Sequence, residues 1–470
     1  MAVRDLVVIG GGAGGLVVAS VAAQLGLSVT LIEKAPVLGG ECLHYGCVPS
    51  KALIAASKLA SAMRSAGDFG LQPFDGEVDL AKVNDHVKRV IARIQVHDDP
   101  ERFRGYGCEV LFGHCEFVGD REIQFEGRSI RARRFLIATG SSPRVPEIEG
   151  IDTVNFDTNE TIFSVRQLPK RLVVLGAGAV GVELAQAFSS LGSKVVIIEQ
   201  SERILPLEDA EMANELAAHL ESRGIEILVS RRVKRLTPGD SGISVECDDG
   251  VVVEADRLLV ATGRKPNVEG LGLEHAGVRV SPTGIKVDRR QRTTNSRIYA
   301  CGDVCGPYQF THAAEYQAGI VISNAIFRVP KKASYDVLPR VIFTDPEFAH
   351  VGHTEGEAES RGIKFDVLRY SFSNVDRAMT DLNGTGSIKL LVSKSKLVGA
   401  TIFGMHAGEL IHELALAMKT GIGIGEITGT IHAYPTVSQV HRRVINTWYG
   451  KRLFSSGSKR FVRWINRILP

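Results

Sequence analysis

Residues 3–34, which read VRDLVVIGGGAGGLVVASVAAQLGLSVTLIEK, decide the fold of the first part of the chain. The apolar run Leu6–Ile9 is typical of a buried parallel strand, and an Ala-rich helical segment leads from it to a second apolar strand that ends at Glu33. Three glycines between strand and helix form the pattern G-x-G-x-x-G: Gly10, Gly12 and Gly15. In this context the pattern predicts a βαβ unit in which the glycine turn and the helix N-terminus bind a pyrophosphate, while the acid binds a ribose hydroxyl.

A second copy of this unit follows at residues 171–200, which read RLVVLGAGAVGVELAQAFSSLGSKVVIIEQ. Its glycines are Gly176, Gly178 and Gly181. Its acid, Glu199, follows the first glycine at the same interval as Glu33 does in the first copy, and an A-T-G segment comes after each copy, at 138–140 and at 261–263. Glycines that serve only as turns do not explain two complete copies. We therefore expect the chain to bind two dinucleotides, one as a tightly held redox cofactor and one that exchanges.

The acid of the second copy indicates which pyridine nucleotide exchanges. A carboxylate at Glu199 accepts a hydrogen bond from a ribose 2′-hydroxyl and repels a 2′-phosphate. The sequence therefore favours NADH over NADPH, although Arg203 lies shortly after Glu199 and weakens that preference.

The composition is that of an ordinary globular protein. The 470 residues include 44% hydrophobic and 23% charged side chains, and the net charge is only +3, so nucleic-acid binding is not expected. Asp5 and the glycine run interrupt the apolar N-terminus, so no signal peptide is expected, and no apolar run reaches the roughly 18 residues of a membrane-spanning helix. The seven cysteines are too sparse for a disulfide scaffold, and a cytoplasmic location is expected.

The first copy carries an insertion that contains a pair of cysteines, in the stretch GGECLHYGCVPSK at residues 39–51. Cys42 and Cys47 lie just before or in the first turns of Lys51–Ala66, an Ala-rich segment that is predicted to be helical. An irregular helix start can bring two such cysteines within disulfide range, and a helix N-terminus stabilises a thiolate. The leading interpretation is a dithiol–disulfide relay beside a flavin; half of a zinc site and a pair of inert core thiols are the alternatives.

With these motifs, the chain resembles the FAD-dependent pyridine nucleotide–disulfide oxidoreductases, the group of dihydrolipoamide dehydrogenase, glutathione reductase and mercuric reductase. The resemblance covers nearly the whole chain. Besides the cysteine motif it rests on four segments, ATGSSPRVPEIEG (138–150), ATGRKPN (261–267), IYACGDV (298–304) and FTDPEFAHVGHTE (343–355). It implies an α/β fold with two Rossmann-like dinucleotide-binding domains and a C-terminal α+β dimerisation domain, and hence a homodimer.

The resemblance also implies a division of the chain into domains. The expected parts are an FAD-binding domain in two pieces (1–148 and 271–339), an NAD(P)H-binding domain (149–270), a dimerisation domain (340–452) and a basic amphipathic tail (453–470).

Individual residues take roles from the same resemblance. Cys47 is expected to lie against the flavin as the charge-transfer thiolate, Cys42 to attack the substrate as the interchange thiol, and Lys51 to pair with Glu183 near flavin N5. The residues expected to bind FAD are Gly10, Gly12, Gly15, Glu33, Lys34, Gly40, Lys51, Cys115, Thr139, Gly140, Asp303, His312 and Ala313. Those expected to bind NAD are Gly176, Gly178, Gly181, Glu183, Glu199 and Gly263. No metal-binding residue is expected.

The segment TIHAYPTVSQVH (430–441) departs from the family pattern. Disulfide reductases of the family carry a His followed by Pro-Thr or Pro-Ser, with a Glu further on, and this His is the general acid/base for the leaving thiol. Here Tyr434 stands at the position of the His and Gln439 at that of the Glu. A tyrosine with a pKa of about 10 is a poor acid/base at neutral pH. The chain also has no cysteine after Cys305, whereas mercuric reductases carry a vicinal pair near the C-terminus.

The predicted function is that of an FAD-dependent NADH oxidoreductase, which passes electrons from NADH through FAD to the Cys42–Cys47 disulfide and on to an unidentified small-molecule or protein acceptor. The alternatives are reduction of lipoamide, of another disulfide or of a metal ion, quinone reduction, transhydrogenation, and a redox sensor without an enzymatic role. The tail SKRFVRWINRILP (458–470) places apolar residues on one helical face and arginines on another, which adds peripheral membrane contact as a hypothesis.

Overall fold

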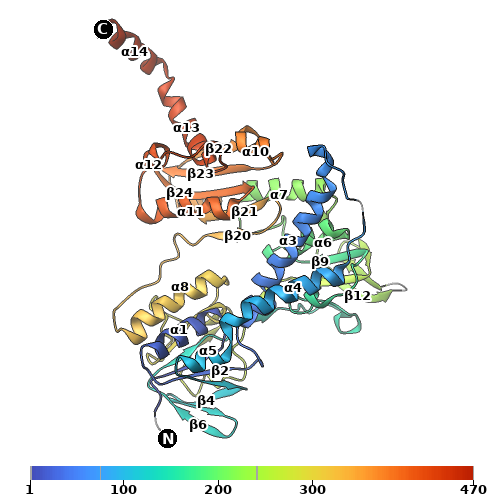
Figure 1. The fold of residues 1–470 in the computed structure, drawn as a ribbon, viewed down its shortest axis with the longest axis vertical. Helices are drawn as coiled ribbons and strands as arrows, with labels where there is room; N and C mark the ends of the chain where they lie inside the picture. The colour runs from blue at the N-terminus through green and yellow to red at the C-terminus, as the bar shows by residue number, and fades with distance from the viewer. Residues whose placement is uncertain (1–2, 75, 240–241, 469–470) are drawn as a thin grey trace. The chain divides into compact units, whose positions relative to one another are not determined.

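A computed structural model describes residues 3–74, 76–239 and 242–468 of the chain. It divides into two compact units (Figure 1). The first unit comprises the chain up to residue 170 with 235–245 and 253–334, and the second comprises 171–234, 246–252 and the chain from 335 onward. The domain boundaries expected from the sequence remain predictions.

The first unit is organised around a parallel sheet with the strand order β19-β7-β1-β2-β3. Its strands are β1 (Leu6–Ile9), β2 (Val29–Glu33), β3 (Cys108–Phe112), β7 (Phe135–Ile137) and β19 (Ile298–Ala300). The first βαβ unit therefore has the strand–helix–strand order that the glycine pattern predicted, and the α/β fold class is confirmed.

Helices and a small second sheet cover the two faces of this parallel sheet. The helices α1 (Ala13–Gln24) and α8 (Thr311–Val321) share one hydrophobic cluster with Val8 of β1. The antiparallel strands β4 (Cys115–Gly119), β5 (Glu122–Phe125) and β6 (Arg128–Arg131) share another with Val7 and Ile9. Because successive side chains of a strand point to opposite faces, this four-residue apolar strand supplies both cores.

The insertion with the two cysteines forms helices. A short helix, α2 (Gly40–His44), is followed by α3 (Cys47–Arg64), which packs against α4 (Leu80–Gln95). The sequence had predicted a helix over Lys51–Ala66, but α3 begins at Cys47. Pro49 lies in the first turn of α3, where backbone N–H groups have no hydrogen-bond partner within the helix. The absence of an N–H on proline therefore costs no helical hydrogen bond, and the helix can begin before Pro49.

The second unit holds the second βαβ copy and the C-terminal sheet. Strands β9 (Arg171–Leu175), β10 (Lys194–Ile198) and β11 (Glu226–Leu228) are parallel, with the helices α6 (Ala179–Leu191) and α7 (Ala210–Ser222) between them in the chain. The C-terminal sheet is antiparallel in the order β20-β21-β24-β23-β22. Its strands are β20 (Arg340–Ile342), β21 (Glu347–Gly352), β22 (Asp366–Ser371), β23 (Ser387–Ser393) and β24 (Lys396–Gly404).

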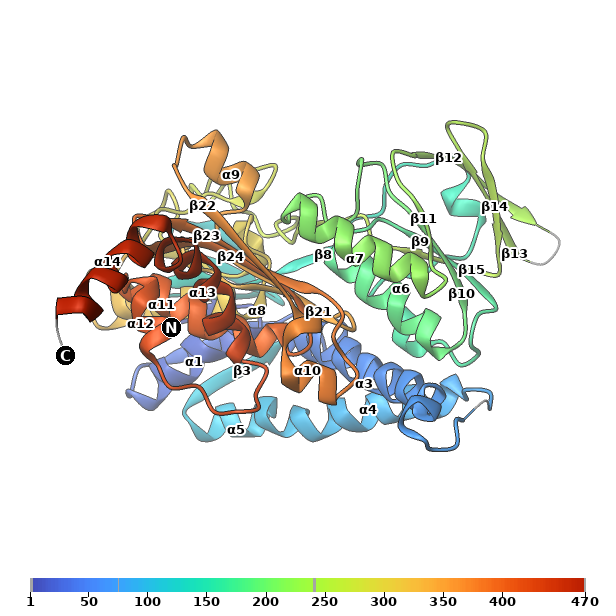
Figure 2. The same ribbon diagram turned by 90° about the horizontal axis from the view of Figure 1, so that it is seen from above.

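The C-terminal sheet also uses its two faces differently. On one face Ile388 and Leu390 of β23 share a hydrophobic core with α11 (Ala407–Thr420) and α13 (Gln439–Leu453), and Figure 2 shows these helices beside the strands. Lys389 lies between these two residues in the strand, so its side chain points to the other face of the sheet. There it bonds to Asp209, the residue before α7.

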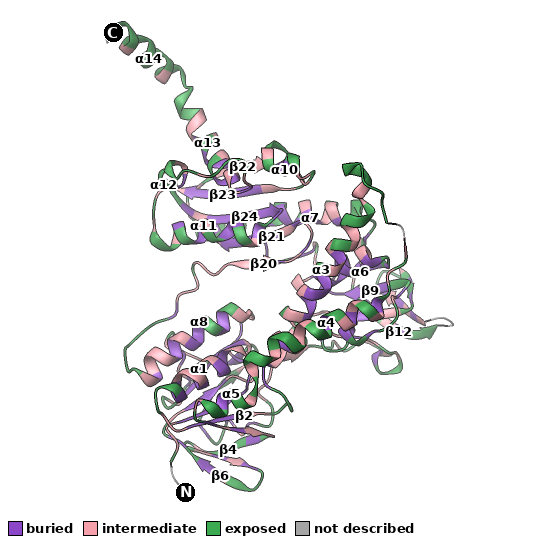
Figure 3. Ribbon diagram, in the orientation of Figure 1, coloured by how far each residue is buried: buried purple, intermediate pink, exposed green. Residues whose placement is uncertain are grey.

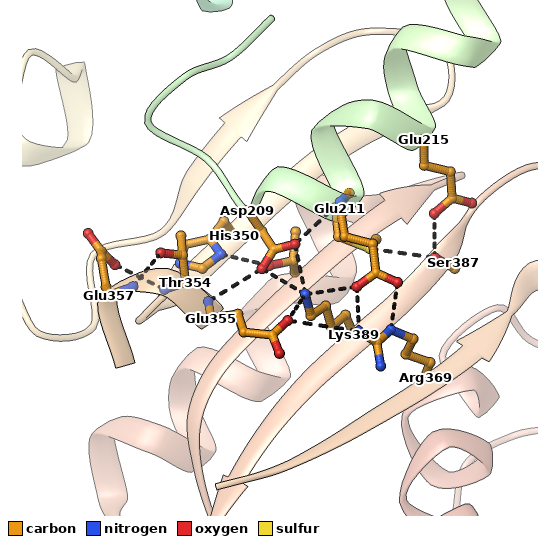
Figure 4. A network of polar contacts seen from close by, with 12 residues as sticks. Asp209, Glu211, Glu215, His350, Thr354, Glu355, Glu357, Arg369, Ser387 and Lys389 are labelled. Atoms are coloured by element: carbon orange, nitrogen blue, oxygen red, sulfur yellow. Dashed lines mark hydrogen bonds and ion pairs between the residues drawn. The ribbon is translucent and has the colours of Figure 1, made fainter. Parts of the chain in front are cut away.

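Lys389 is the centre of a buried ionic network that joins β23 to α7 (Figure 4). Its ammonium, only 2% exposed, lies 3.0 Å from the Asp209 carboxylate and 3.0 Å from that of Glu211, and it also pairs with Glu355. Arg369 neutralises Glu211 further, with an Nε–Oε1 distance of 2.7 Å. Burial works to lower the pKa of Lys389, but the bonds to these carboxylates raise it above its ordinary value, so the ammonium remains charged. An ion buried in this way is tolerated because several partners replace its water.

Candidate active site

The glycine turn of the first unit brings two backbone segments into direct contact. Gly10 has φ +108°, and a Cβ there would lie 2.3 Å from the carbonyl oxygen of Ala138. A Cβ on Gly15 would lie 2.0 Å from the carbonyl oxygen of Gly10. No side chain fits at either position, so α1 begins directly over the end of β1. Gly12 is the residue before α1. A Cβ on Gly12 would have Cα of Gly40 as its nearest neighbour, 3.8 Å away, so the space beside this backbone is not filled by other parts of the protein.

Both acids of the repeated unit are anchored in the same way. The carboxylate of Glu33 accepts the N–H of Gly11 at 2.6 Å, and that of Glu199 accepts the N–H of Ala177 at 2.7 Å. Each carboxylate also accepts the N–H two residues further along the chain, at 2.8 Å in both copies. These bonds hold each acid at the entrance of its glycine turn, where the predicted ribose would lie.

The residues expected to bind FAD lie at the carboxyl ends of four neighbouring strands, which is where parallel α/β sheets bind ligands. Gly10 follows β1, Glu33 ends β2, Thr139 and Gly140 follow β7, and Asp303 follows β19. A Cβ on Gly140 would meet no atom within 4 Å, so the backbone there borders open space. The donor set, the open backbone and the helix N-terminus fit FAD.

The other members of the predicted FAD set are placed less uniformly. Lys34 is exposed after β2, and the ring of His312 stacks on that of Phe310 with a centroid distance of 5.3 Å. Ala313 is buried in α8. Cys115 begins β4 inside the hydrophobic core, and burial raises the pKa of its thiol to about 12. The Cys115 side chain is therefore an inert core group, and only its backbone remains as a contact for FAD.

The two cysteines of the insertion are in hydrogen-bond contact in the dithiol form. Cys47 is exposed at the first position of the 18-residue helix α3, whereas Cys42 is partly buried in α2. The hydrogen bond to the Cys47 sulfur, together with burial, strongly raises the pKa of Cys42. A negative charge on the pair therefore belongs on Cys47, where the helix N-terminus and the Thr311 hydroxyl, 3.4 Å from Sγ, stabilise it.

A polar network beside Cys42 was not predicted from the sequence. Arg264 forms an ion pair with Glu41, and its Nε donates to the Ser141 hydroxyl at 2.7 Å. Ser141 in turn donates to Asp303 at 2.7 Å, and Asn159 donates to Glu41 at 2.8 Å. Burial raises the pKa of Glu41, against the opposing effect of Arg264. The network links the residue before Cys42 to Ser141 and Asp303, at the edge of the sheet where FAD is expected to bind.

Lys51 and Glu183 belong to different compact units, and their pairing remains a prediction. The Nζ of Lys51 donates to the Ser50 hydroxyl at 3.3 Å. Glu183 is only 6% exposed, which rules out a solvent-facing residue, and its carboxylate accepts the N–H of Phe343 at 2.9 Å. In the second glycine turn, a Cβ on Gly178 would meet no atom within 4 Å, so this turn is open to a nucleotide as well.

The remaining residues of the predicted NAD set are described by their elements. Gly176, with φ +103°, follows β9, and Gly181 is buried within α6. Gly263 lies in the first unit after β15 (Arg257–Val260), and its contact with the nucleotide remains a prediction.

In the segment 430–441, Tyr434 is exposed, whereas the side chains of both histidines are buried. The Tyr434 side chain is 69% exposed, and the amide of Gln439 is occupied by the carbonyls of His432 and Ala433, each 3.2 Å away. The imidazole of His432 is turned inward, with 5% of its side chain exposed, and bonds to Glu413. The structure thus agrees with the sequence that no histidine occupies the position of the family's acid/base residue.

Comparison with known proteins identifies two family domains in this chain. Residues 4–318 match the pyridine nucleotide-disulphide oxidoreductase family, and residues 338–444 match its dimerisation domain. A mercuric reductase of Staphylococcus aureus is 34% identical over 441 residues, which cover 93% of this chain and 80% of that protein. A dihydrolipoyl dehydrogenase of Thermus scotoductus is 37% identical, with 93% and 96% covered. The solved Cu(II) complex of the HOCl-induced flavoprotein disulfide reductase RclA from Escherichia coli has a TM-score of 0.86 at 26% identity and covers 94% of this chain and 99% of that one.

Serine substitutions separate the roles of the two cysteines. In the FAD-loaded protein, reduction is expected to produce a long-wavelength absorbance from a thiolate beside the flavin. Cys47→Ser should abolish this absorbance if Cys47 is that thiolate. Cys42→Ser is the matched variant and should retain the band. Visible spectra during anaerobic titration with dithionite measure it, and the opposite pattern would assign the thiolate to Cys42.

Proposed function

Since the chain belongs to the pyridine nucleotide-disulphide oxidoreductase family of flavin-dependent enzymes, we propose that it passes electrons from NADH through FAD to Cys42 and Cys47 and reduces a metal ion. When bound, FAD accepts a hydride from the nicotinamide and supplies two electrons. FAD and a pyridine nucleotide are the cofactors of the family, and its dimerisation domain supports a homodimer. The acceptor, the electron route and the preference for NADH are the proposed parts.

One observation carries the choice of acceptor: the acid/base position holds an exposed Tyr434 while the neighbouring His432 is turned inward. Reduction of a small disulfide expels a thiolate, which leaves slowly unless an acid protonates it. A metal ion that accepts electrons needs no such proton. Two relatives point the same way, because one is a mercuric reductase and another has been solved as a Cu(II) complex.

The chain's own residues define what the site can do with such an ion. The side chains of Cys42 and Cys47 are in hydrogen-bond contact, and thiolates are the preferred ligands of soft metal ions. Oxidation of the two thiols to a disulfide releases two protons to solvent and two electrons, which reduce one Hg²⁺ to Hg⁰ or two Cu²⁺ to Cu⁺. The Arg264–Glu41 pair holds the backbone beside Cys42, so the sulfurs keep their position during the exchange.

The proposed acceptor is tested by NADH oxidation with Cu²⁺ or Hg²⁺, oxidised lipoamide and oxidised glutathione as acceptors. The metal ions should give the faster turnover, and Cys42→Ser should abolish it. Tyr434→His with Gln439→Glu should raise disulfide turnover, because general acid assistance is worth about 10²–10⁴-fold. Each single substitution serves as control. Turnover of oxidised lipoamide by the unaltered enzyme at tens per second, on the usual scale of about 1–10³ s⁻¹, would refute the proposal.

The preference for NADH is proposed to come from the charge of Glu199. Its carboxylate is held by the N–H of Ala177, so a 2′-phosphate would meet a fixed negative charge. We expect kcat/KM to be at least about tenfold higher with NADH, which corresponds to roughly 1.4 kcal/mol. Glu199→Gln removes the charge and keeps an acceptor for that N–H, so the ratio should fall toward one. Glu221→Gln, exposed on α7, is the matched control, and equal use of both nucleotides by the unaltered enzyme contradicts the assignment.

The terminal helix α14 (Ser456–Ile468) is proposed to contact an anionic membrane surface. None of its residues is buried (Figure 3), and Phe461, Trp464 and Ile468 are each more than half exposed. Three arginines lie on another face: Arg460, Arg463 and Arg467. Such a helix lies in the interface, with its apolar face in the acyl boundary. Among the helices that the structure describes, none combines the length and apolarity needed to span a membrane. Residues 469 and 470 of the predicted tail lie outside the described part of the chain.

Membrane contact is tested by co-sedimentation with vesicles. The chain should bind vesicles that contain phosphatidylserine and not those of phosphatidylcholine alone, because both an apolar face and basic residues contribute. Trp464→Ser should weaken binding, whereas Trp448→Phe in the packed helix α13 should not. Equal sedimentation with and without vesicles would exclude this role.

A further inference from the structure

Within the described part of the chain, three metal-ligand side chains come together at one place outside the cysteine site. Glu413 is on α11, His441 is on α13, and His432 lies in the connection between these helices. One ligand atom from each lies within 4.8 Å of the others. The proposed electron transfer uses none of these three residues.

Backbone geometry determines where His432 carries its proton. Its Nδ1 lies 3.0 Å from the carbonyl oxygen of Thr430, an acceptor only, so Nδ1 is protonated and donates to it. In the neutral ring, the electron pair of Nε2 then faces the Glu413 carboxylate, with Nε2–O distances of 3.1 and 3.3 Å. Two electron-rich atoms at that distance repel unless a proton or a metal ion lies between them. A ring that donates its second N–H to a backbone carbonyl is also the usual arrangement of a metal-binding histidine.

His441 is the third candidate metal ligand, and its ring contacts the same Glu413 carboxylate. Its Nδ1 lies 2.7 Å from Oε2 of Glu413. A proton can serve one nitrogen–oxygen pair, whereas a metal ion can serve both imidazoles and the carboxylate at once. Tetrahedral Zn²⁺ with ligand distances of about 2.0–2.2 Å places its donor atoms roughly 3.3 Å apart. The two imidazole–carboxylate separations, 3.1 and 2.7 Å, are close to this value, and all three ligand atoms lie within 4.8 Å of one another.

We propose that Glu413, His432 and His441 bind one divalent transition-metal ion of the Zn²⁺ class. Two imidazoles and a carboxylate are ligands that suit Zn²⁺, Cu²⁺ and Ni²⁺. The side chains of His432 and His441 are only 5% and 1% exposed, whereas that of Glu413 is 34% exposed, so the ion enters beside Glu413 and keeps a position for water. The ion joins α11 to α13 and fixes the connection that carries Tyr434.

Zn²⁺ binding is measured on the FAD-loaded chain in which Cys42 and Cys47 are both replaced by serine. The redox thiols then bind no ion, and the result does not depend on whether the proposed electron transfer takes place. The protein is first treated with EDTA and dialysed. Equilibrium dialysis with elemental analysis should show one Zn²⁺ per chain, and the thermal unfolding midpoint should rise with Zn²⁺ concentration. Co²⁺ in place of Zn²⁺ should give the visible bands of a tetrahedral site.

Ligand variants locate the ion. His441→Phe and Glu413→Gln should each weaken Zn²⁺ binding by at least roughly 10- to 100-fold, the effect of losing even an outer-shell partner. Because the chain has 13 histidines, matched controls are needed: His412→Gln and Glu409→Gln on α11 should leave binding unchanged. If a ligand variant fails to fold, the stoichiometry and midpoint shift of the parent chain decide.

Two results would overturn the proposal. A midpoint that does not respond to Zn²⁺, with no ion retained on dialysis, would make the cluster a metal-free ion pair between protonated His432 and Glu413. Binding that survives both His441→Phe and Glu413→Gln would place the ion elsewhere.

Discussion

The direct contact between the backbone of Gly15 and that of Gly10 is the constraint on which the first unit depends. A Cβ at Gly15 would lie 2.0 Å from the Gly10 carbonyl oxygen, so only glycine allows α1 to begin at the end of β1. That approach aims the N–H groups of the first helical turn at the carboxyl edge of the sheet, where a pyrophosphate binds. The carboxylate of Glu33 then anchors the turn through the N–H of Gly11. The second unit repeats the anchor at Glu199, so one physical solution serves two nucleotides.

The cysteine site depends on this edge for its position and on a helix start for its chemistry. Cys47 gains stabilisation of negative charge from the first turn of α3, while Cys42 keeps its proton through the hydrogen bond to Cys47. Arg264 and Glu41 connect the backbone beside Cys42 to the FAD-binding edge. The reactivity of the pair is thus local, but its placement against a cofactor is a property of the assembled unit.

The C-terminal part contains charge that is buried and compensated. Lys389 pairs with three carboxylates on one face of the sheet, and Glu413 of α11 contacts the imidazoles of His432 and of His441 on α13. Burial of such groups requires close partners, because removal of one leaves an uncompensated charge. His432, two residues before the acid/base position, is turned inward toward Glu413, and the residue at that position is the exposed Tyr434.

The sequence by itself determined the two βαβ units with their glycine turns and acids, because each depends on residue spacing within some thirty residues. Strands β3, β7 and β19 join the sheet of the first unit from positions far along the chain, so only the tertiary structure gave their order. The sequence also located the departure at Tyr434 and Gln439, since a motif shows which residue types are missing. The helix expected to begin at Lys51 begins at Cys47, because the first turn of a helix accommodates Pro49. Only the tertiary structure decided that Glu41 pairs with Arg264, that Lys389 reaches Asp209, and that His441 meets Glu413. The physical reason is that an ionic side chain can pair with any residue of opposite charge. Which of the distant residues becomes its partner depends on how the helices and strands pack, because only side chains on facing elements come into contact.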